Sequence, residues 1–270
     1  MATDPKPAEP SGTTTHDVHG APCWITLLAS DLSRAQAFYG AVFGWTFRHA
    51  RLGDQFSTAL HGGAPIAGIG TLEPDWRAPV DWTPYFAVGD ADEAAARIQE
   101  RCATVAVGPL SLPVGRGALA ADRDGAVFGI WEGELISDWA TWRKAAPVWL
   151  RLRTRDAFDA AIFYGQVLDW ACDLPGCCQV DYEKGEVVVR QEGHVVARLS
   201  SGAVETAPNP MVKPRWHVLF PVYDVRAAVE GATRNGGSVL GERQTPDGPE
   251  VTLRDPEGAL FTVTSDRAPR

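Results

Sequence analysis

Aromatic and basic side chains recur at alternate positions of segments that the sequence predicts as strands. Alternate side chains of a strand share one face, so Trp149 shares its face with Arg151 and Arg153. Such a face suits a planar organic ligand, because a ring forms an apolar wall and a guanidinium pairs with a carboxylate or phenolate. The sequence therefore predicts small-molecule binding here; the alternative is that the tryptophan fills a core and the arginines are solvated.

Two further pairs follow the same alternation, since Trp24 shares a face with Thr26 and Thr83 shares one with Tyr85. A histidine, His217, lies in another predicted strand, and imidazole can act as a general base because it titrates near neutral pH. The resemblance given below makes His217 the candidate catalytic residue. The candidate ligand-binding residues are Trp24, Thr26, Thr83, Tyr85, Trp149, Arg151, Arg153 and His217.

Other catalytic motifs are missing from the sequence, including a glycine-rich loop that opens a helix, a Walker loop, a Gly-x-Ser-x-Gly elbow and His-Glu-x-x-His. The five cysteines contain no Cys-x-x-Cys pair, so we expect neither a disulfide framework nor a structural zinc site. The adjacent Cys177 and Cys178 are interpreted as small residues near a turn, with a redox-active pair as the alternative. This cysteine usage favours a cytoplasmic protein.

Length and charge limit the class of protein. The 270 residues suggest about two domains at ~150 residues each. The formal net charge of −9 argues against nucleic acid or an anionic membrane surface as a partner, since both need a basic footprint. No apolar run approaches the ~18 residues of a membrane span. Residues 1–20 lack an apolar core and predict a flexible tail rather than a signal peptide.

The chain repeats itself. WITLLASDLSRAQAFYGAVFGW (24–45) and WLRLRTRDAFDAAIFYGQVLDW (149–170) share Trp, Asp, Phe-Tyr-Gly and Trp at a constant offset of 125 residues. A second pair, DRDGAVFGIWEG (122–133) and RDPEGALFTVTSD (254–266), aligns at an offset of 133. We therefore predict domains over 21–136 and 147–266, joined by a linker over 137–146 that has no strong pattern.

Each half is predicted as strand, helix and three strands, twice over. In the first module a strand over 23–29 leads to a helix that Asp31 or Ser33 can cap. Apolar residues follow that helix at spacings of three and four, which predicts one buried face. Later helices are predicted over 90–102, 156–168 and 224–235. The fold class is α+β, with four βαβββ modules.

In this pattern the chain resembles the vicinal oxygen chelate superfamily, which groups glyoxalases, bleomycin resistance proteins and extradiol dioxygenases. The resemblance rests on the run at 31–45, on its copy at 156–170 and on two Asp-x-x-Gly-Ala-x-Phe hairpins at 122–128 and 255–261. It implies two glyoxalase-like domains with strongly curved mixed sheets around cups. Modules one and two can share a cup, as can three and four; alternatively module one pairs with four, and two with three.

The resemblance also implies where metal ligands would stand. The positions on first strands are Trp24, Thr83 or Pro84, Trp149 and His217, and those on last strands are Gly129 and Thr262. One imidazole cannot hold a catalytic divalent ion, and the indole of Trp has no lone pair to donate. We therefore expect no metal and no other cofactor, with a divalent metal as the alternative. Substitute donors would be His61, His194, Glu132 or Glu192.

The resemblance leads to three hypotheses. The first is metal-independent binding of a small aromatic or hydrophobic organic molecule in a cup, of the resistance or sequestration type. The second is an enzyme on a small organic molecule (a lyase, isomerase, hydroxylase or dioxygenase) with His217 as base or metal ligand. The third is an interaction protein whose cups are filled by Trp24 and Trp149. Four modules in one chain favour a monomer, with a homodimer as the alternative.

Overall fold

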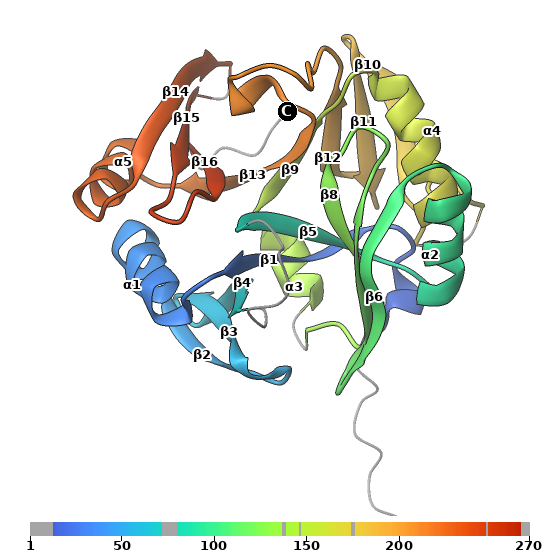
Figure 1. Cartoon of the computed structure of the whole chain (residues 1–270), viewed down its shortest axis with the longest axis horizontal. Helices are drawn as coiled ribbons and strands as arrows, with labels where there is room; N and C mark the ends of the chain where they lie inside the picture. The colour runs from blue at the N-terminus through green and yellow to red at the C-terminus, as the bar shows by residue number, and fades with distance from the viewer. Residues whose placement is uncertain are drawn as a thin grey trace, which may run out of the picture.

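The computed structural model describes residues 13–71, 80–136, 139–145, 147–173, 176–246 and 248–265 (Figure 1). Its first half follows the predicted order of two modules. The elements are β1 (Pro22–Ala29), α1 (Leu32–Phe43), β2 (Thr46–Ala50), β3 (Gly53–His61), β4 (Ala64–Thr71), β5 (Asp81–Ala87), α2 (Ala91–Glu100), β6 (Thr104–Leu112), β7 (Gly115–Ala121) and β8 (Val127–Gly133).

The second half repeats this order after a connecting helix, α3 (Trp139–Ala145). Two short 3₁₀ helices, η1 (Thr15–Asp17) and η2 (Pro210–Val212), precede β1 and β13. The remaining elements are β9 (Trp149–Arg153), α4 (Ala157–Leu168), β10 (Gln179–Glu183), β11 (Glu186–Gln191), β12 (His194–Ser200), β13 (Arg215–Val222), α5 (Val225–Arg234), β14 (Ser238–Thr245), β15 (Gly248–Arg254) and β16 (Leu260–Ser265).

Each half forms its own eight-stranded mixed sheet. The strand orders are β2-β3-β4-β1-β5-β8-β7-β6 and β10-β11-β12-β9-β13-β16-β15-β14. The first strands of two consecutive modules pair antiparallel at the centre, β1 with β5 and β9 with β13. Module one therefore shares a sheet with module two, and module three with module four. Both sheets curve strongly, as the resemblance implied (Figure 1).

The helices begin where the sequence predicts them. Asp31 accepts a hydrogen bond from the backbone N–H of Arg34, so Asp31, and not Ser33, caps α1. Asp156 caps α4 in the same way. The buried face of α1 carries Phe38, Tyr39 and Val42, at the spacing that the apolar pattern predicted.

The two sheets pack back to back on the faces that carry the helices. The ring of Trp82 on β5 contacts Phe220 on β13, with 5.1 Å between centroids. Helix α1 contacts α5, and α2 contacts α4, so each helix pair joins the two domains (Figure 1). Side chains such as Ile25 and Leu152 are fully buried in this shared core. The opposite, concave face of each sheet is free of these four helices, and we call the two faces the first cup and the second cup.

Part of the predicted N-terminal tail is built into the fold, so the prediction of a flexible tail over 1–20 is wrong for residues 13–20. The backbone N–H of Gly20 donates to Ala87 in the first domain. The indole N–H of Trp170, in the second domain, donates to the carbonyl of Gly20 at 2.8 Å. This segment therefore ties the two domains together, and residues 1–12 lie outside the described part of the chain.

The cysteine prediction also needs correction. Cys172 and Cys177 form a disulfide that closes the turn after α4, which the sequence analysis did not predict because the pair lacks a recognised spacing. Cys178 stays a free thiol, and burial raises its pKa to about 12. Cys177 is thus bonded to Cys172 and not to its neighbour Cys178 in this structure. Within the described residues no helix is long and apolar enough to cross a membrane.

Candidate functional site: two cups with different linings

The first cup brings together the four predicted residues of the first domain. Trp24 lies directly opposite Tyr85 across the β1–β5 pair, and Thr26 lies opposite Thr83. Their neighbours Ile25 and Phe86 point into the shared core, so all four candidates face the concave side. Trp24 and Tyr85 remain partly exposed, as the wall of a binding site must be.

Glycines beneath the rings create the flat lining of the first cup. A Cβ atom built on Gly129 would meet the ring of Tyr85 at 2.3 Å, which no real contact allows. A Cβ atom on Gly68 would come within 2.9 Å of the indole nitrogen of Trp24, and one on Gly70 within 2.4 Å of the Phe56 ring. These positions must therefore stay glycine for the rings to lie against the sheet.

The connecting helix α3 lies against the first sheet near β4 (Figure 1) and supplies a further ring to this cup. Trp142 packs against Trp24 with 5.8 Å between ring centroids, and its indole N–H donates to the carbonyl of Ile66 on β4 at 3.0 Å. The prediction of a patternless linker over 137–146 missed this helix. The spacing of Trp139 and Trp142 by three residues, one helical turn, was the available signal.

The second cup brings together the predicted residues of the second domain in a charged setting. Arg151 lies directly opposite His217 across the β9–β13 pair, Arg153 lies opposite Arg215, and Trp149 lies opposite Leu219. The two candidate sets, four residues in each cup, therefore belong to different sites. Trp24 does not face His217, which the alternative pairing of modules would have required.

A buried carboxylate, Glu250 on β15, anchors part of this cluster. Arg151 donates to its two oxygens at 3.0 and 3.1 Å, and Arg243 on β14 donates to it at 2.5 Å. Burial alone would raise the pKa of Glu250, but the hydrogen bonds and charge of Arg151 and Arg243 outweigh burial and lower it. The sequence analysis missed Glu250 and Arg243, because the register of β14 and β15 decides which of their residues enter the cup. It also missed Arg215, although alternation along β13 places this residue on the same face as His217.

His217 is held neutral in this cluster. Burial disfavours its cationic form, and the charges of Arg215, Arg151, Arg153 and Arg243 add to that effect, so its pKa falls to about 3. An imidazole with so low a pKa accepts a proton poorly at neutral pH. The surroundings of His217 thus differ from those of an effective general base.

The residues at the family's metal positions do not fit a divalent cation. Trp149 offers no lone pair, and the hydroxyl of Thr262 is engaged with Thr252 at 2.8 Å. His217 is surrounded by guanidinium groups that repel a cation. Among the described residues no group of three or more His, Cys, Asp or Glu side chains gathers at one point.

The substitute donors do not converge either. Glu132 accepts a hydrogen bond from the backbone N–H of Ala91 at the start of α2, away from the first cup. Glu192 pairs with Arg143 of α3, and the ring of His194 contacts the carbonyl of Glu192. These donors therefore stabilise separate local structures.

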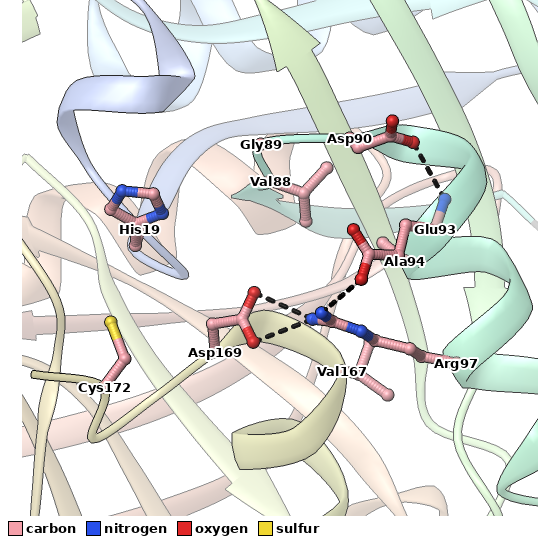
Figure 2. Close-up of a pocket in the computed structure, with 10 residues that line it drawn as sticks. All are labelled: His19, Val88, Gly89, Asp90, Glu93, Ala94, Arg97, Val167, Asp169 and Cys172. Atoms are coloured by element: carbon pink, nitrogen blue, oxygen red, sulfur yellow. Dashed lines mark hydrogen bonds and ion pairs between the residues drawn. The ribbon is translucent and has the colours of Figure 1, made fainter. Parts of the chain in front are cut away.

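A hollow of about 280 Å³ lies between the domains, where α2 meets the end of α4 (Figure 2). Arg97 lies between two carboxylates there, bonding Asp169 at 2.7 and 2.8 Å and Glu93 at 2.6 Å. The charges of Arg97, Asp169 and Glu93 at this hollow are thus paired with one another. The side chains of His19 and Cys172 border the same hollow. We interpret it as part of the connection between domains.

Comparison with known proteins agrees with this architecture. Residues 23–130 match the model of the Glyoxalase/Bleomycin resistance protein/Dioxygenase superfamily, and residues 149–264 match that of the Glyoxalase-like domain. The chain belongs to the glyoxalase, bleomycin resistance protein and dioxygenase superfamily. Within this superfamily it is a tandem member with two domains.

Two relatives in the superfamily come from Streptomyces. The chain is 31% identical over 268 residues to the anthracycline biosynthesis protein DauV of Streptomyces sp. (strain C5), covering 92% of this chain and 94% of that protein. It is 30% identical over 271 residues to the anthracycline biosynthesis protein DnrV of Streptomyces peucetius, with the same coverage of 92% and 94%.

Solved structures of superfamily members share the fold. A Mn(II)-bound glyoxalase from Novosphingobium aromaticivorans superposes with a TM-score of 0.55 at 17% identity, covering 92% of this chain and 83% of that one. A variant of homoprotocatechuate 2,3-dioxygenase from B. fuscum gives a TM-score of 0.55 at 14% identity, covering 97% and 75%. At these identities the likeness shows the fold alone.

Proposed function

We propose that the protein binds a small planar aromatic molecule in the first cup, without a metal ion. The carrying observation is the set of rings that lie flat over glycines. Trp24 and Tyr85 are opposite each other on the central strands, and Gly68 and Gly129 leave room for them. Aromatic walls of this kind bind planar rings by stacking and by burial of apolar surface, at ~0.5–1.5 kcal/mol for each ring pair beyond the area term.

The polar groups of the first cup fit the same ligand class. Thr26 and Thr83 are buried side chains that form the next pair along β1 and β5 from Trp24 and Tyr85, so each can place a hydroxyl at the edge of a bound molecule. The described inner-face residues of β1 and β5 around them carry no charge except Asp81 at the strand end, which pairs with Arg215. A neutral ligand with hydroxyl or carbonyl groups therefore suits this cup.

The Streptomyces relatives indicate which chemical class of ligand should be tested first. Both are named for anthracycline biosynthesis, and anthracyclines are built on fused planar rings. A fused-ring quinone is therefore the appropriate probe. The proposal covers both sequestration and conversion of the bound molecule. In either case His217 does not contact this molecule, because it lies in the other cup.

Metal independence is supported by the donor set. The first cup offers Trp24, Thr83 and Gly129 at the family's ligand positions, and none of them is a strong ligand for a divalent ion. Because each cup closes within one chain, we also keep the proposal that the protein acts as a monomer.

The test is a titration of the full chain with quinizarin, a neutral dihydroxyanthraquinone, followed by calorimetry and tryptophan fluorescence. We expect saturable binding at one site, unchanged by a chelator. Trp24→Ala should weaken it at least tenfold, about 1.4 kcal/mol. Trp149→Ala, the equivalent change in the repeat, should leave the affinity unchanged. Binding that survives Trp24→Ala and fails in Trp149→Ala would refute the assignment to the first cup.

A further inference from the structure

The second cup concentrates positive charge in an acidic protein. The chain carries a net charge of −9, yet four arginines surround His217 on the inner face of the second sheet. Two carboxylates pair with this cluster, Glu250 with Arg151 and Arg243, and Asp81 of the first domain with Arg215. Since His217 is neutral, two positive charges remain without a carboxylate among the described residues.

One uncompensated charge lies at Arg153, since Arg215 pairs with Asp81; the other belongs to Arg151 and Arg243, which have only Glu250 between them. Arg153 and Arg215 are directly opposite each other on antiparallel strands, where like charges destabilise a sheet. Arg153 uses one terminal nitrogen to donate to the carbonyl of Gly202 at 2.9 Å. The Nε atoms of both arginines are buried and have no hydrogen-bond partner among the described residues. A buried donor without an acceptor is costly, so an acceptor bound here would stabilise the cluster.

Two other arginines of the same sheet are paired. Arg198 on β12 pairs with Glu186 at 3.7 Å, and Arg190 on β11 pairs with Asp181 and Glu183. Among the described arginines, the buried Nε atoms without a hydrogen-bond partner are those of Arg153 on β9 and Arg215 on β13. This argues for a site at these two strands.

We propose that the second cup is a separate binding site for an aromatic carboxylate, whose carboxylate group accepts hydrogen bonds from Arg153 and Arg215. A guanidinium presents its donors in a plane that matches the two oxygens of a carboxylate. Trp149 lies on the same face of β9, four residues from Arg153, and Leu219 lies opposite Trp149. The ring of the ligand stacks on this apolar end while its carboxylate reaches the arginines.

The spacing sets the size of the ligand. Four residues of a strand span about 13 Å, part of which the long arginine side chains bridge. A fused two-ring acid fits this span better than a single ring. The proposal thus assigns different chemistry to the two cups, a neutral planar molecule to the first and an organic anion to the second.

The experiment compares 2-naphthoate with its neutral counterpart 2-naphthamide by calorimetry on the full chain. We expect naphthoate to bind at least tenfold more tightly, and Arg153→Gln to remove this preference. Arg51→Gln makes the same charge change on the exposed β2–β3 turn and should preserve the preference. Arg153→Lys keeps the charge without the planar donors, should reduce the preference, and replaces the glutamine variant if that variant does not fold.

Three results would overturn the proposal. The first is equal affinity for the acid and the amide. The second is a preference for the acid that Arg153→Gln leaves intact. The third is inorganic phosphate competing as well as naphthoate, which would mean a simple oxyanion site. Quinizarin binding to the first cup should persist in Arg153→Gln, so a failure here is distinguishable from a failure of the proposed function.

Discussion

The hydroxyl of Tyr39 donates a hydrogen bond to Asp255 across the domain boundary, with 3.0 Å between the oxygens. Tyr164 makes the equivalent bond to Asp122 in the opposite direction, at 2.9 Å. Each tyrosine hydroxyl also accepts the indole N–H of a tryptophan on the central strand of its own sheet. The tyrosine of each Phe-Tyr-Gly sequence thus forms a hydrogen bond that joins the two domains.

Tyr39→Phe should therefore destabilise the protein by about 1–3 kcal/mol, because it leaves the buried N–H of Trp82 without an acceptor. Urea denaturation measures this change. Tyr182→Phe is the matched control, since Tyr182 is exposed on β10. Equal stability of the two variants would mean that the hydrogen bond to Asp255 contributes nothing.

The pKa of His217, lowered to about 3 by burial and then by its arginines, predicts a pH dependence of stability. The unfolded chain has the ordinary histidine pKa of ~6.5, so it binds the proton more tightly than the folded chain does. The contribution is fully present above pH 6.5 and is lost as the pH falls from there toward 3. At pH 5.5 this amounts to about 1.4 kcal/mol.

His217→Gln should reduce the loss of stability between pH 7.5 and 5.5 by that amount, measured by denaturation at both pH values. His61→Gln, at an exposed histidine, should behave like the wild type. A glutamine variant at 217 with the full pH dependence would show that another group is responsible.

Gly129→Ala should displace the ring of Tyr85, because the added methyl group would lie 2.3 Å from it. We expect a loss of about 1–3 kcal/mol in stability and weaker quinizarin binding. The comparison is Gly165→Ala on α4, where a Cβ meets nothing within 4 Å and alanine favours the helix. If both variants bind quinizarin like the wild type, the rings over glycine do not form the site.

Trp142→Ala should detach α3 from the first cup and cost about 3 kcal/mol, as for other buried tryptophans. Trp142→Phe keeps an aromatic ring but loses the hydrogen bond to Ile66, so it should be intermediate. Thermal unfolding gives the stabilities. An alanine variant as stable as the wild type would show that α3 is not held in place by this contact.

Adding Mn, Fe, Ni or Zn to chelator-treated protein should leave the unfolding temperature unchanged. The physical reason is that guanidinium groups, rather than carboxylates, surround His217. Elemental analysis of protein purified without metal affinity steps gives the resident metal content. A saturable shift that disappears in His217→Gln would establish a metal site despite this surrounding charge.

Much of the fold could be predicted because the duplicated Phe-Tyr-Gly run marks each half and because its helix caps are local features. The alternation of strands also placed Trp24 with Thr26, and Trp149 with Arg151, on one face. The pairing of modules could not be predicted, since either arrangement satisfies the same local pattern. The disulfide, α3 and the segment at 13–20 depend on contacts between distant parts of the chain.

The ion pairs of the second cup could not be predicted from the sequence for a similar reason. Arg153 could be assigned to a face from its own strand, but Glu250 reaches the cluster through a hairpin whose register contains an irregularity between Val239 and Gly241. Sequence alternation alone therefore identified the candidate residues without their counter-charges, and so without the low pKa of His217.

The ion pair between Asp81 and Arg215 has a consequence for how the two halves relate. Each residue opens its strand, β5 or β13, and directly precedes a tryptophan, so the two occupy the same position of the repeat and meet where the two domains contact each other. A homodimer of either half would bring aspartate against aspartate, or arginine against arginine. The two halves of the chain are thus complementary in charge at this position, and exchanging one half for a copy of the other would lose the ion pair.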